Sequence, residues 1–290
     1  MWEHVLTSRQ EGEIIKKEHL AESTTLMRIY HPKIAKKVKA GQFFIVVADE
    51  KSERIPLTAA DWDREEGWIE MVFLEIGYST KKLGMLPEGY VLMNLVGPLG
   101  NPTHVEGYKK VAIVGGGVGI ANTYPVARAF RERGTEVHTI LGARSADRLF
   151  YVEKLRGVSD KLYICTDDGS VGRKGFVSDQ LKDLLDSGEK FDLVFTVGPA
   201  IMMKVVSELT KAYGVKTIAS LNPIMLCGMG MCGVCRVTVG GQIRFACFHG
   251  PEFDAHQVDF NELLARLAMY REEEQVMLKK LEEEEVVKYE

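Results

Sequence analysis

The chain has 290 residues, of which 46% are hydrophobic and 27% charged, and its formal net charge is −4. This length suits two ordinary domains with an appendage, and the small net charge gives no electrostatic basis for binding nucleic acid or an anionic membrane. The N-terminal residues lack the apolar core of a signal peptide, and no later segment is apolar over the length that a bilayer requires. We therefore expect a cytoplasmic protein with no nucleic-acid or membrane partner.

The N-terminal region alternates short β-strands with turns. Gln42–Ala48 and Trp68–Gly77 are rich in β-branched and aromatic residues, and Tyr90–Pro102 begins as a strand and ends in a run of Gly and Pro. Several short strands at this spacing predict a small antiparallel β-barrel. We assign this barrel to residues 1–101 and place the domain boundary near Asn101–Glu106.

Beyond the barrel, strands alternate with helices. Lys109–Gly134 predicts a buried strand, a glycine turn and an amphipathic helix that Gly134 closes. Glu136–Arg144 and Lys161–Ser170 predict further strands, and Phe191–Gly214 predicts a strand followed by a helix. This alternation indicates an α/β Rossmann-like domain with a parallel sheet, which we assign to residues 102–221.

The glycine turn of this domain has the composition of a nucleotide-binding loop. Glycines between a buried strand and a helix let the backbone approach a pyrophosphate, whose charge lies against the helix N-terminus. The spacing departs from the full G-x-G-x-x-G fingerprint, so a tight turn without a ligand is the alternative. We predict dinucleotide binding at Gly115, Gly116, Gly117 and Gly119.

Four of the five cysteines are Cys227, Cys232, Cys235 and Cys247, spaced C-x4-C-x2-C-x11-C. In a reducing cytosol, clustered cysteines are more often metal ligands than disulfides. The first three have the plant-type spacing for a 2Fe–2S cluster, with the fourth arriving from a nearby strand. A zinc site, which prefers two C-x2-C-like pairs, and a site without metal are the alternatives. We predict a 2Fe–2S segment over residues 222–250.

Glycines and a hairpin complete the predicted cluster segment. Gly228, Gly230 and Gly233 let the loop curl around a cluster and aim backbone N–H groups at its sulfurs. The stretch Arg236–Cys247 predicts a hairpin that delivers the fourth cysteine. The fifth cysteine, Cys165, falls in a buried strand, where we expect a small core residue.

The last part of the chain, residues 251–290, is predicted to be a helical extension. Asn261–Glu285 has helical spacing and ends in a run of glutamates. We expect a solvated helix face or a frayed end there, and a docking site for a partner is the alternative.

Four further motifs resemble those of ferredoxin–NADP⁺ reductase-like flavoproteins. RIPLT (Arg54–Thr58) resembles the flavin motif of that family and GYST (Gly77–Thr80) its second phosphate contact, while DDGS (Asp167–Ser170) and VGPAIMM (Val197–Met203) resemble its nicotinamide-binding half. The resemblance implies that FAD and a nicotinamide nucleotide bind here. The residues it implies are Arg54, Pro56, Leu57, Thr58, Gly77, Ser79 and Thr80 for FAD, and Asp168, Gly198 and Pro199 for NAD(P).

A barrel, a nicotinamide domain and a C-terminal 2Fe–2S loop, in this order, resemble two kinds of electron-transfer subunit. One belongs to dihydroorotate dehydrogenase. The other is the small (alpha) subunit of NADH-dependent reduced ferredoxin:NADP⁺ oxidoreductase, also described as sulfide dehydrogenase, to which GPEFDAHQVDF (Gly250–Phe260) is similar. The resemblance implies electron transfer between NAD(H), FAD and a 2Fe–2S cluster in an electron-bifurcating complex. It also implies a heterodimer or larger assembly with a bigger flavoprotein that carries 4Fe–4S clusters and reaches ferredoxin.

The chain departs from this second family at one position and is ambiguous at another. Some members carry Asp at the first cluster position, where this chain has Cys227, and four thiolates imply a different reduction potential. The stretch Gly142–Ser145 offers Arg and Ser to a 2′-phosphate, which favours NADP(H), whereas the family favours NAD(H), which we adopt. Hydride transfer to a flavin needs no side-chain acid or base, so we predict no catalytic residue. The non-redox alternative is a zinc-stabilised nucleotide-binding module.

Overall fold

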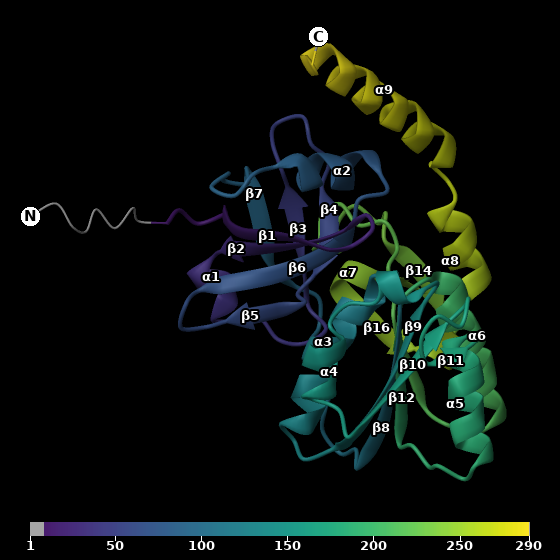
Figure 1. Cartoon of the computed structure of the whole chain (residues 1–290). Helices are drawn as coiled ribbons and strands as arrows, with labels where there is room; N and C mark the ends of the chain where they lie inside the picture. Colours follow the sequence, from purple (N-terminus) through teal and green to yellow (C-terminus); the bar gives the residue numbers. More distant parts are fainter. Residues whose placement is uncertain (1–8, 290) are drawn as a thin grey trace, which may run out of the picture.

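The computed structural model describes residues 9–289 (Figure 1). The first eight residues of the predicted barrel, and Glu290 of the predicted helical extension, lie outside the described residues. In Figure 1 the N-terminal strands form one body and the central and C-terminal elements form a second body beside it.

The N-terminal body consists of two antiparallel sheets around one core, as the barrel prediction required. The first sheet has the order β1-β2-β6-β5 and the second has the order β4-β3-β7. Their bounds are β1 Glu13–Ala21, β2 Thr24–Tyr30, β3 Phe43–Val47, β4 Ile55–Thr58, β5 Asp61–Asp63, β6 Trp68–Leu74 and β7 Asn94–Leu99, with short helices α1 Pro32–Ala35 and α2 Tyr78–Met85. Met27, Phe44 and Met71 are fully buried between the two sheets.

Strand β3 is buried on both faces, which explains its unbroken apolar sequence. Because alternate residues of a strand point to opposite sides, Phe44 and Val46 enter the barrel core, whereas Phe43 and Ile45 pack against the C-terminal segment. The barrel therefore contributes one strand to a second core outside itself.

The second body is a seven-stranded sheet of order β11-β10-β9-β8-β12-β13-β16. All strands are parallel except β16, which pairs antiparallel to β13. Their bounds are β8 Lys110–Gly116, β9 Glu136–Ala143, β10 Lys161–Thr166, β11 Arg173–Lys174, β12 Leu193–Val197, β13 Thr217–Ser220 and β16 Glu252–Asp254. The predicted strand–helix alternation is confirmed.

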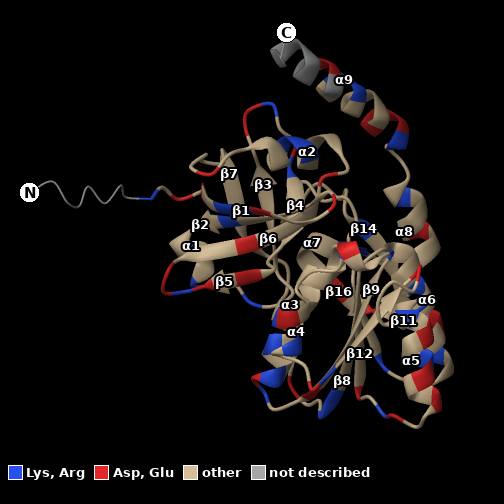
Figure 2. Ribbon diagram, viewed as in Figure 1, with Lys and Arg blue, Asp and Glu red and all other residues tan. Residues whose placement is uncertain are grey.

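Helices cover both faces of this sheet, as expected for a parallel sheet whose strands are apolar throughout. Helices α3 Gly119–Arg131 and α4 Val152–Arg156 pack on one face, and α5 Val177–Asp186 and α6 Ala200–Ala212 on the other. Figure 2 shows acidic and basic residues on the helices and loops, while the central strands are almost free of them.

The C-terminal segment adds a hairpin, β14 Arg236–Val239 and β15 Gln242–Phe245, and returns to the sheet through β16. Gly240 and Gly241 have φ of 58° and 73°, which is the backbone of the tight turn that Gly-Gly favours. The remaining elements are η1 Ala146–Arg148, α7 Ala246–His249, η2 Ala255–Gln257, α8 Phe260–Leu267 and α9 Arg271–Tyr289.

The predicted C-terminal helix is two helices rather than one. Helix α8 ends at Leu267 and α9 begins at Arg271. Glu272, Glu273 and Glu274 occupy the first turn of α9, where carboxylates are favoured by the helix dipole and support a new start. These glutamates are exposed, as expected for a solvated face, but Leu281 is buried, and α9 runs from α8 towards α2 (Figure 1).

Candidate functional site

The two glycine motifs of the nucleotide domain lie against each other at the carboxyl ends of β8 and β12. Gly115 and Val197 are partners in the parallel pairing of these strands. A Cβ atom on Gly119 would lie 2.4 Å from the carbonyl oxygen of Val197, and one on Gly198 would lie 2.8 Å from that of Gly116. The chain approaches itself here too closely for a side chain.

Helices α3 and α6 begin directly after these glycine motifs. Gly117 has a φ of 56° and hydrogen-bonds through its N–H group to the carbonyl of Gly142 at 3.1 Å, so the turn is also tied to β9. Pro199 caps α6. Two helix N-termini at one edge of a parallel sheet form the usual place for a pyrophosphate.

Asp168 stands just beyond the end of β10. Its carboxylate accepts hydrogen bonds from the hydroxyl of Ser170 at 2.7 Å and from the backbone N–H of Ser170 at 2.9 Å, and these bonds lower the pKa of Asp168. The hydroxyl of Ser170 accepts from the N–H of Ala146, beyond the end of β9, at 2.8 Å. The exposed Arg144 lies beside this pair, since its carbonyl accepts from the N–H of Asp168 at 3.2 Å.

The predicted flavin motif forms β4 and the residue before it. Pro56, Leu57 and Thr58 pair with β3. The side chain of Leu57 is buried in the barrel core, so only its backbone is available to a ligand, whereas Pro56 and Thr58 are partly exposed. Arg54 is also partly exposed, and its Nε donates to the carbonyl oxygen of Leu226 at 2.6 Å.

The GYST motif forms the N-terminus of α2. The N–H of Gly77 donates to the hydroxyl of Thr80 at 3.1 Å, which caps the helix. Ser79 donates to Glu53 at 2.5 Å, next to Arg54. The fold thus brings the two motifs predicted for FAD together, although they are separate in the sequence.

The four clustered cysteines lie in two pairs. The sulfurs of Cys235 and Cys247 are 3.3 Å apart, and Cys232 lies close enough to Cys227 to lower its pKa. In a 2Fe–2S cluster each iron takes two protein ligands, so two pairs of thiols fit its ligand set. Within residues 9–289, no three His, Cys, Asp or Glu side chains converge as a site for a single metal ion.

Backbone N–H groups point at these sulfurs. The N–H of Gly230 donates to Cys247 Sγ at 3.1 Å, and the N–H of Met229 to Cys227 Sγ at 3.5 Å. Burial raises the pKa of Cys227, but hydrogen bonds from Cys232 and Met229 outweigh it and lower the pKa to about 6. At Cys227 the loop therefore favours the thiolate, which is the form that binds metal.

The structure places Cys247 on the short helix α7, just past the end of β15, and not on the strand that the hairpin pattern predicted. Burial, and then the neighbouring Cys235, raise the pKa of Cys247 to about 12. Cys165 is fully buried in β10, and burial raises its pKa to about 11, as befits an inert core residue.

The cysteine loop packs directly on the barrel. Gly228 has a φ of 75°, and a Cβ atom there would lie 2.5 Å from Leu99 Cδ1 and 3.1 Å from Ile45 Cγ1. Together with the hydrogen bond from Arg54 to Leu226, this contact places the predicted flavin strand and the predicted cluster loop side by side.

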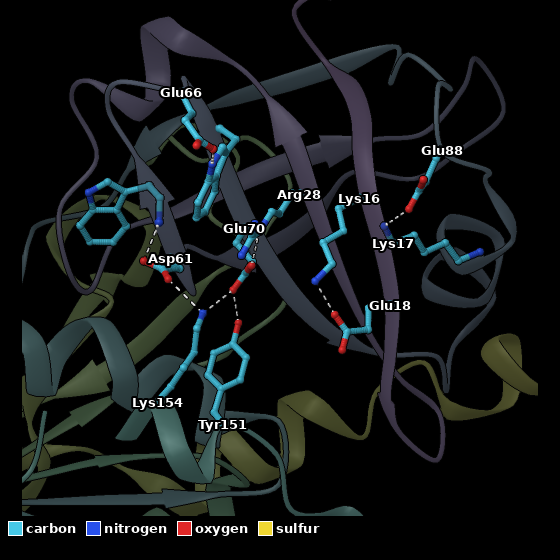
Figure 3. A network of polar contacts seen from close by, with 12 residues as sticks. Lys16, Lys17, Glu18, Arg28, Asp61, Glu66, Glu70, Glu88, Tyr151 and Lys154 are labelled. Atoms are coloured by element: carbon cyan, nitrogen blue, oxygen red, sulfur yellow. Dashed lines mark hydrogen bonds and ion pairs between the residues drawn. The ribbon is translucent and has the colours of Figure 1, made fainter. Parts of the chain in front are cut away.

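One polar feature carried no sequence motif. Asp61 and Glu70 of the barrel meet Tyr151 and Lys154 of the second body in a partly buried network (Figure 3). Arg128 of the second body also donates to Asp61. The unusual backbone of Tyr151, with a φ of 60°, is visible only in the structure.

The fold and these sites define an NAD-binding, iron–sulfur electron-transfer protein. Residues 113–208 match the family described as the oxidoreductase NAD-binding domain, and residues 222–259 match the iron–sulfur cluster binding domain of dihydroorotate dehydrogenase B. The chain is therefore a subunit of an NAD(P)H-dependent oxidoreductase.

Relatives extend this match along the chain. A protein of Thermotoga maritima described as "Dihydroorotate dehydrogenase B (NAD(+)), electron transfer subunit homolog" is 49% identical over 265 residues, which cover 91% of this chain and 93% of the relative. The "Dihydroorotate dehydrogenase B (NAD(+)), electron transfer subunit" of Fusobacterium nucleatum subsp. nucleatum is 30% identical, with 83% and 94% covered. The chain belongs to this family of electron-transfer subunits.

A solved structure of the NADH-dependent reduced ferredoxin–NADP oxidoreductase, described in the context of flavin-based electron bifurcation, is similar over nearly its full length. The TM-score is 0.90 at 45% identity, with 95% of this chain and 99% of that chain covered. Phthalate dioxygenase reductase shares the fold, with a TM-score of 0.58 at 17% identity over 78% of this chain and 85% of that chain. The predicted family and fold class are confirmed. The predicted cofactors FAD, NAD(H) and 2Fe–2S are those of this family.

No helix among the residues that the structure describes combines the length and the apolar character needed to cross a membrane.

Proposed function

We propose that the chain moves electrons between NAD(H), FAD and a 2Fe–2S cluster as the small subunit of an electron-bifurcating ferredoxin:NADP⁺ oxidoreductase complex. The observation that carries this proposal is the near end-to-end similarity, at 45% identity, to the solved NADH-dependent reduced ferredoxin–NADP oxidoreductase. We also propose that it works in the cytoplasm and that its domains divide at residues 101, 221 and 250.

FAD, when bound, accepts a hydride from a nicotinamide and releases electrons singly, which suits a one-electron cluster. Arg54 would pair its guanidinium with the FAD pyrophosphate, while Thr58 and the backbone of β4 would face the flavin ring. Gly77, Ser79 and Thr80 would complete the phosphate site at the start of α2. These assignments are supported by the contact between Ser79 and Glu53, which joins the two motifs.

For the nicotinamide nucleotide, Gly115–Gly119 and Gly198–Pro199 would seat the pyrophosphate between the starts of α3 and α6. Asp168, kept ionised by Ser170, would accept a hydrogen bond from a ribose hydroxyl. A carboxylate there repels a 2′-phosphate, whereas Arg144 attracts one. We propose NAD(H) as the substrate, and a comparison of kcat/KM for NADH and NADPH tests it directly.

We propose that Cys227 and Cys232 hold one iron and that Cys235 and Cys247 hold the other, which the 3.3 Å contact of the last two sulfurs supports. Apolar side chains around this loop are exposed, with Met229 at 53%, Met231 at 81% and Phe248 at 60%. Exposed apolar groups that gather in one place mark an interaction surface. We propose that the larger flavoprotein, with its 4Fe–4S clusters, docks over this loop and connects it to ferredoxin.

The experiment that tests the proposed function is anaerobic purification of the chain from its native cell, with mass spectrometry of what travels with it. We expect a flavoprotein with 4Fe–4S cysteine motifs, and a complex that couples NADPH oxidation to the reduction of NAD⁺ and ferredoxin. Recovery of the chain alone, with no flavin and no ferredoxin-dependent activity in the same fractions, would contradict the proposal.

A second candidate is the electron-transfer subunit of dihydroorotate dehydrogenase. The family of the iron–sulfur domain and the descriptions of the Thermotoga maritima and Fusobacterium nucleatum relatives favour it. In that case the same purification yields a barrel-fold catalytic partner with FMN, and the complex reduces NAD⁺ with dihydroorotate. Metal analysis separates both candidates from a zinc-stabilised module, which would contain zinc and no flavin.

A further inference from the structure

The barrel and the nucleotide domain are joined by a group of charges, centred on two buried carboxylates, that the proposed function does not use. Figure 3 shows Tyr151 and Lys154 reaching up to the carboxyl groups of Asp61 and Glu70, which lie on β5 and β6 of the barrel. We call these four residues and Arg28 and Arg128 the interdomain clamp.

Glu70 is the centre of the clamp. Its side chain is fully buried, and it accepts hydrogen bonds from Arg28 Nε at 2.6 Å, from Lys154 Nζ at 3.0 Å and from the hydroxyl of Tyr151. Arg28 belongs to β2 of the barrel, whereas Tyr151 and Lys154 come from the other body. A buried carboxylate is tolerated only with such partners.

Asp61 forms the second half of the clamp. It accepts from Arg128 at 2.7 Å and from Lys154 Nζ at 3.0 Å, so Lys154 bridges both carboxylates. An aromatic ring also packs on one of the cations: Arg128 Cζ lies 4.6 Å from the ring centre of Trp62, which is a cation–π contact. Apolar side chains of both bodies surround this contact in one continuous core.

The backbone and the proton positions of the clamp are both constrained. Tyr151 has a φ of 60°, a strained conformation for a residue other than Gly that persists only where the surroundings enforce it. Burial and the nearby Glu70 raise the pKa of Tyr151, so its hydroxyl keeps the proton that it donates. Burial would lower the pKa of Lys154, but Glu70 and Asp61 outweigh it and keep the ammonium charged.

The clamp acts on the elements that carry the two predicted cofactor sites. Asp61 follows the flavin strand directly, with only Ala59 and Ala60 between it and Thr58. Arg128 lies on α3, the helix that begins at the glycine turn. Because strands and helices are stiff, the ion pair between Asp61 and Arg128 fixes the flavin strand relative to the nucleotide loop.

We propose that Asp61, Glu70, Tyr151 and Lys154 are positioning residues that hold the nicotinamide against the flavin at the distance hydride transfer requires. This inference rests on the proposed binding of NAD(H) and FAD. Small displacements of reacting groups have large effects on rate, so loosening the clamp slows hydride transfer while each cofactor still binds its own domain.

The test uses the purified holoprotein with its flavin and iron, mixed anaerobically with NADH in a stopped-flow spectrophotometer. Glu70→Gln removes one charge at constant shape, and Tyr151→Phe removes one hydroxyl. We expect flavin reduction to slow by about tenfold or more in Glu70→Gln and less in Tyr151→Phe. We also expect the long-wavelength absorbance of stacked nicotinamide and flavin to weaken, and the apparent Kd for NADH to stay within about twofold.

The matched control is Glu22→Gln, which breaks the ion pair of Glu22 with Arg148. This pair also crosses between the two bodies, but the side chain of Glu22 is 65% exposed, whereas that of Glu70 is fully buried. We expect Glu22→Gln to reduce its flavin at the wild-type rate, because exposed ion pairs contribute little to the stability of a contact.

Three outcomes overturn the inference. The first is a Glu70→Gln protein that keeps its flavin and iron and reduces its flavin at the wild-type rate, with the long-wavelength absorbance of stacked nicotinamide and flavin unchanged. That result overturns this inference and leaves the proposed function standing. The second applies if Glu70→Gln does not fold: a Tyr151→Phe protein with the wild-type rate of flavin reduction and the wild-type long-wavelength absorbance also overturns the inference. A wild-type protein that binds no flavin overturns the proposed function first, and this inference with it.

Discussion

The barrel is held to the rest of the chain at two seams of opposite chemistry. At the cluster seam, Gly228 of the cysteine loop lies on Leu99 and Ile45, and the contact is one of close-packed apolar atoms. At the clamp seam, Glu70 and Asp61 exchange charge-assisted hydrogen bonds with residues of α3 and α4. Apolar packing tolerates changes that conserve volume, whereas a buried ion pair does not tolerate the loss of one partner. The cluster seam therefore depends on complementary shape, whereas the clamp seam fixes the orientation of the barrel relative to the nucleotide domain.

The largest effect belongs to the cluster ligands. Cys235→Ser removes one thiolate from the Cys235–Cys247 pair, and we expect iron and sulfide content to fall to near zero. Elemental analysis and visible absorbance check this, and Cys165→Ala is the control that should keep the iron. Full iron in the Cys235→Ser protein would mean that the assigned ligands are wrong.

The clamp should be the costliest seam to break. Glu70→Ala removes a fully buried carboxylate from Arg28 and Lys154, whose side chains are 28% and 33% exposed, so we expect a loss of about 3 kcal/mol, the low end of the range for a broken buried pair. Glu22→Gln, at the exposed pair with Arg148, should cost less than about 1 kcal/mol. Urea unfolding of the two variants measures the contrast, and equal losses would remove the distinction drawn between buried and exposed pairs.

A titratable group lies beside the cluster seam, where β16 meets the barrel. Glu252 of β16 accepts from the hydroxyl of Thr103 at 2.6 Å, and a Cβ on Gly41 would lie 2.4 Å from its carboxyl oxygen. Burial raises the pKa of Glu252 to about 7, against the smaller opposite effect of Thr103.

This shift predicts how stability depends on pH. Because the folded state binds the proton of Glu252 more tightly than the unfolded state, stability falls as pH rises between about 4.5 and 7 and then stays level. The whole change is about 3 kcal/mol. Denaturant melts at pH 5 and pH 8 check this, and Glu252→Gln should remove that part of the slope. A variant whose slope equals that of the wild type would show that Glu252 titrates normally.

The smallest predicted effect is a difference in stability between two glycine variants. It separates the cost of packing at the cluster seam from the cost of backbone strain. Gly228 and Gly241 have φ of 75° and 73°, but only Gly228 has atoms within 4 Å of an added Cβ. Gly228→Ala should therefore cost about 1–2 kcal/mol more than Gly241→Ala. It should also release iron faster on dilution into chelator. Equal stability of the two variants would show that the loop is not pressed against Leu99.

The two seams also differ in how far sequence reasoning reaches them. The glycine turn, the strand–helix alternation and the cysteine spacing are each contained in one short stretch, so local patterns were enough to predict them. The clamp is assembled from β2, β5, β6, α3 and α4, and each of its charges taken alone has the pattern of a solvent-facing residue. The break between α8 and α9 and the helical position of Cys247 depend on packing that no periodicity records.

Electron transfer from NADH through the flavin to the cluster is tested most directly by an anaerobic titration of the purified holoprotein with NADH, followed by absorbance and by electron paramagnetic resonance. We expect NADH to bleach the flavin and the signal of a reduced 2Fe–2S cluster to appear as electrons pass on. The Cys235→Ser protein should keep the bleaching and lose the signal. Flavin that NADH leaves oxidised, or a cysteine loop that holds zinc and gives no signal, would contradict this electron transfer.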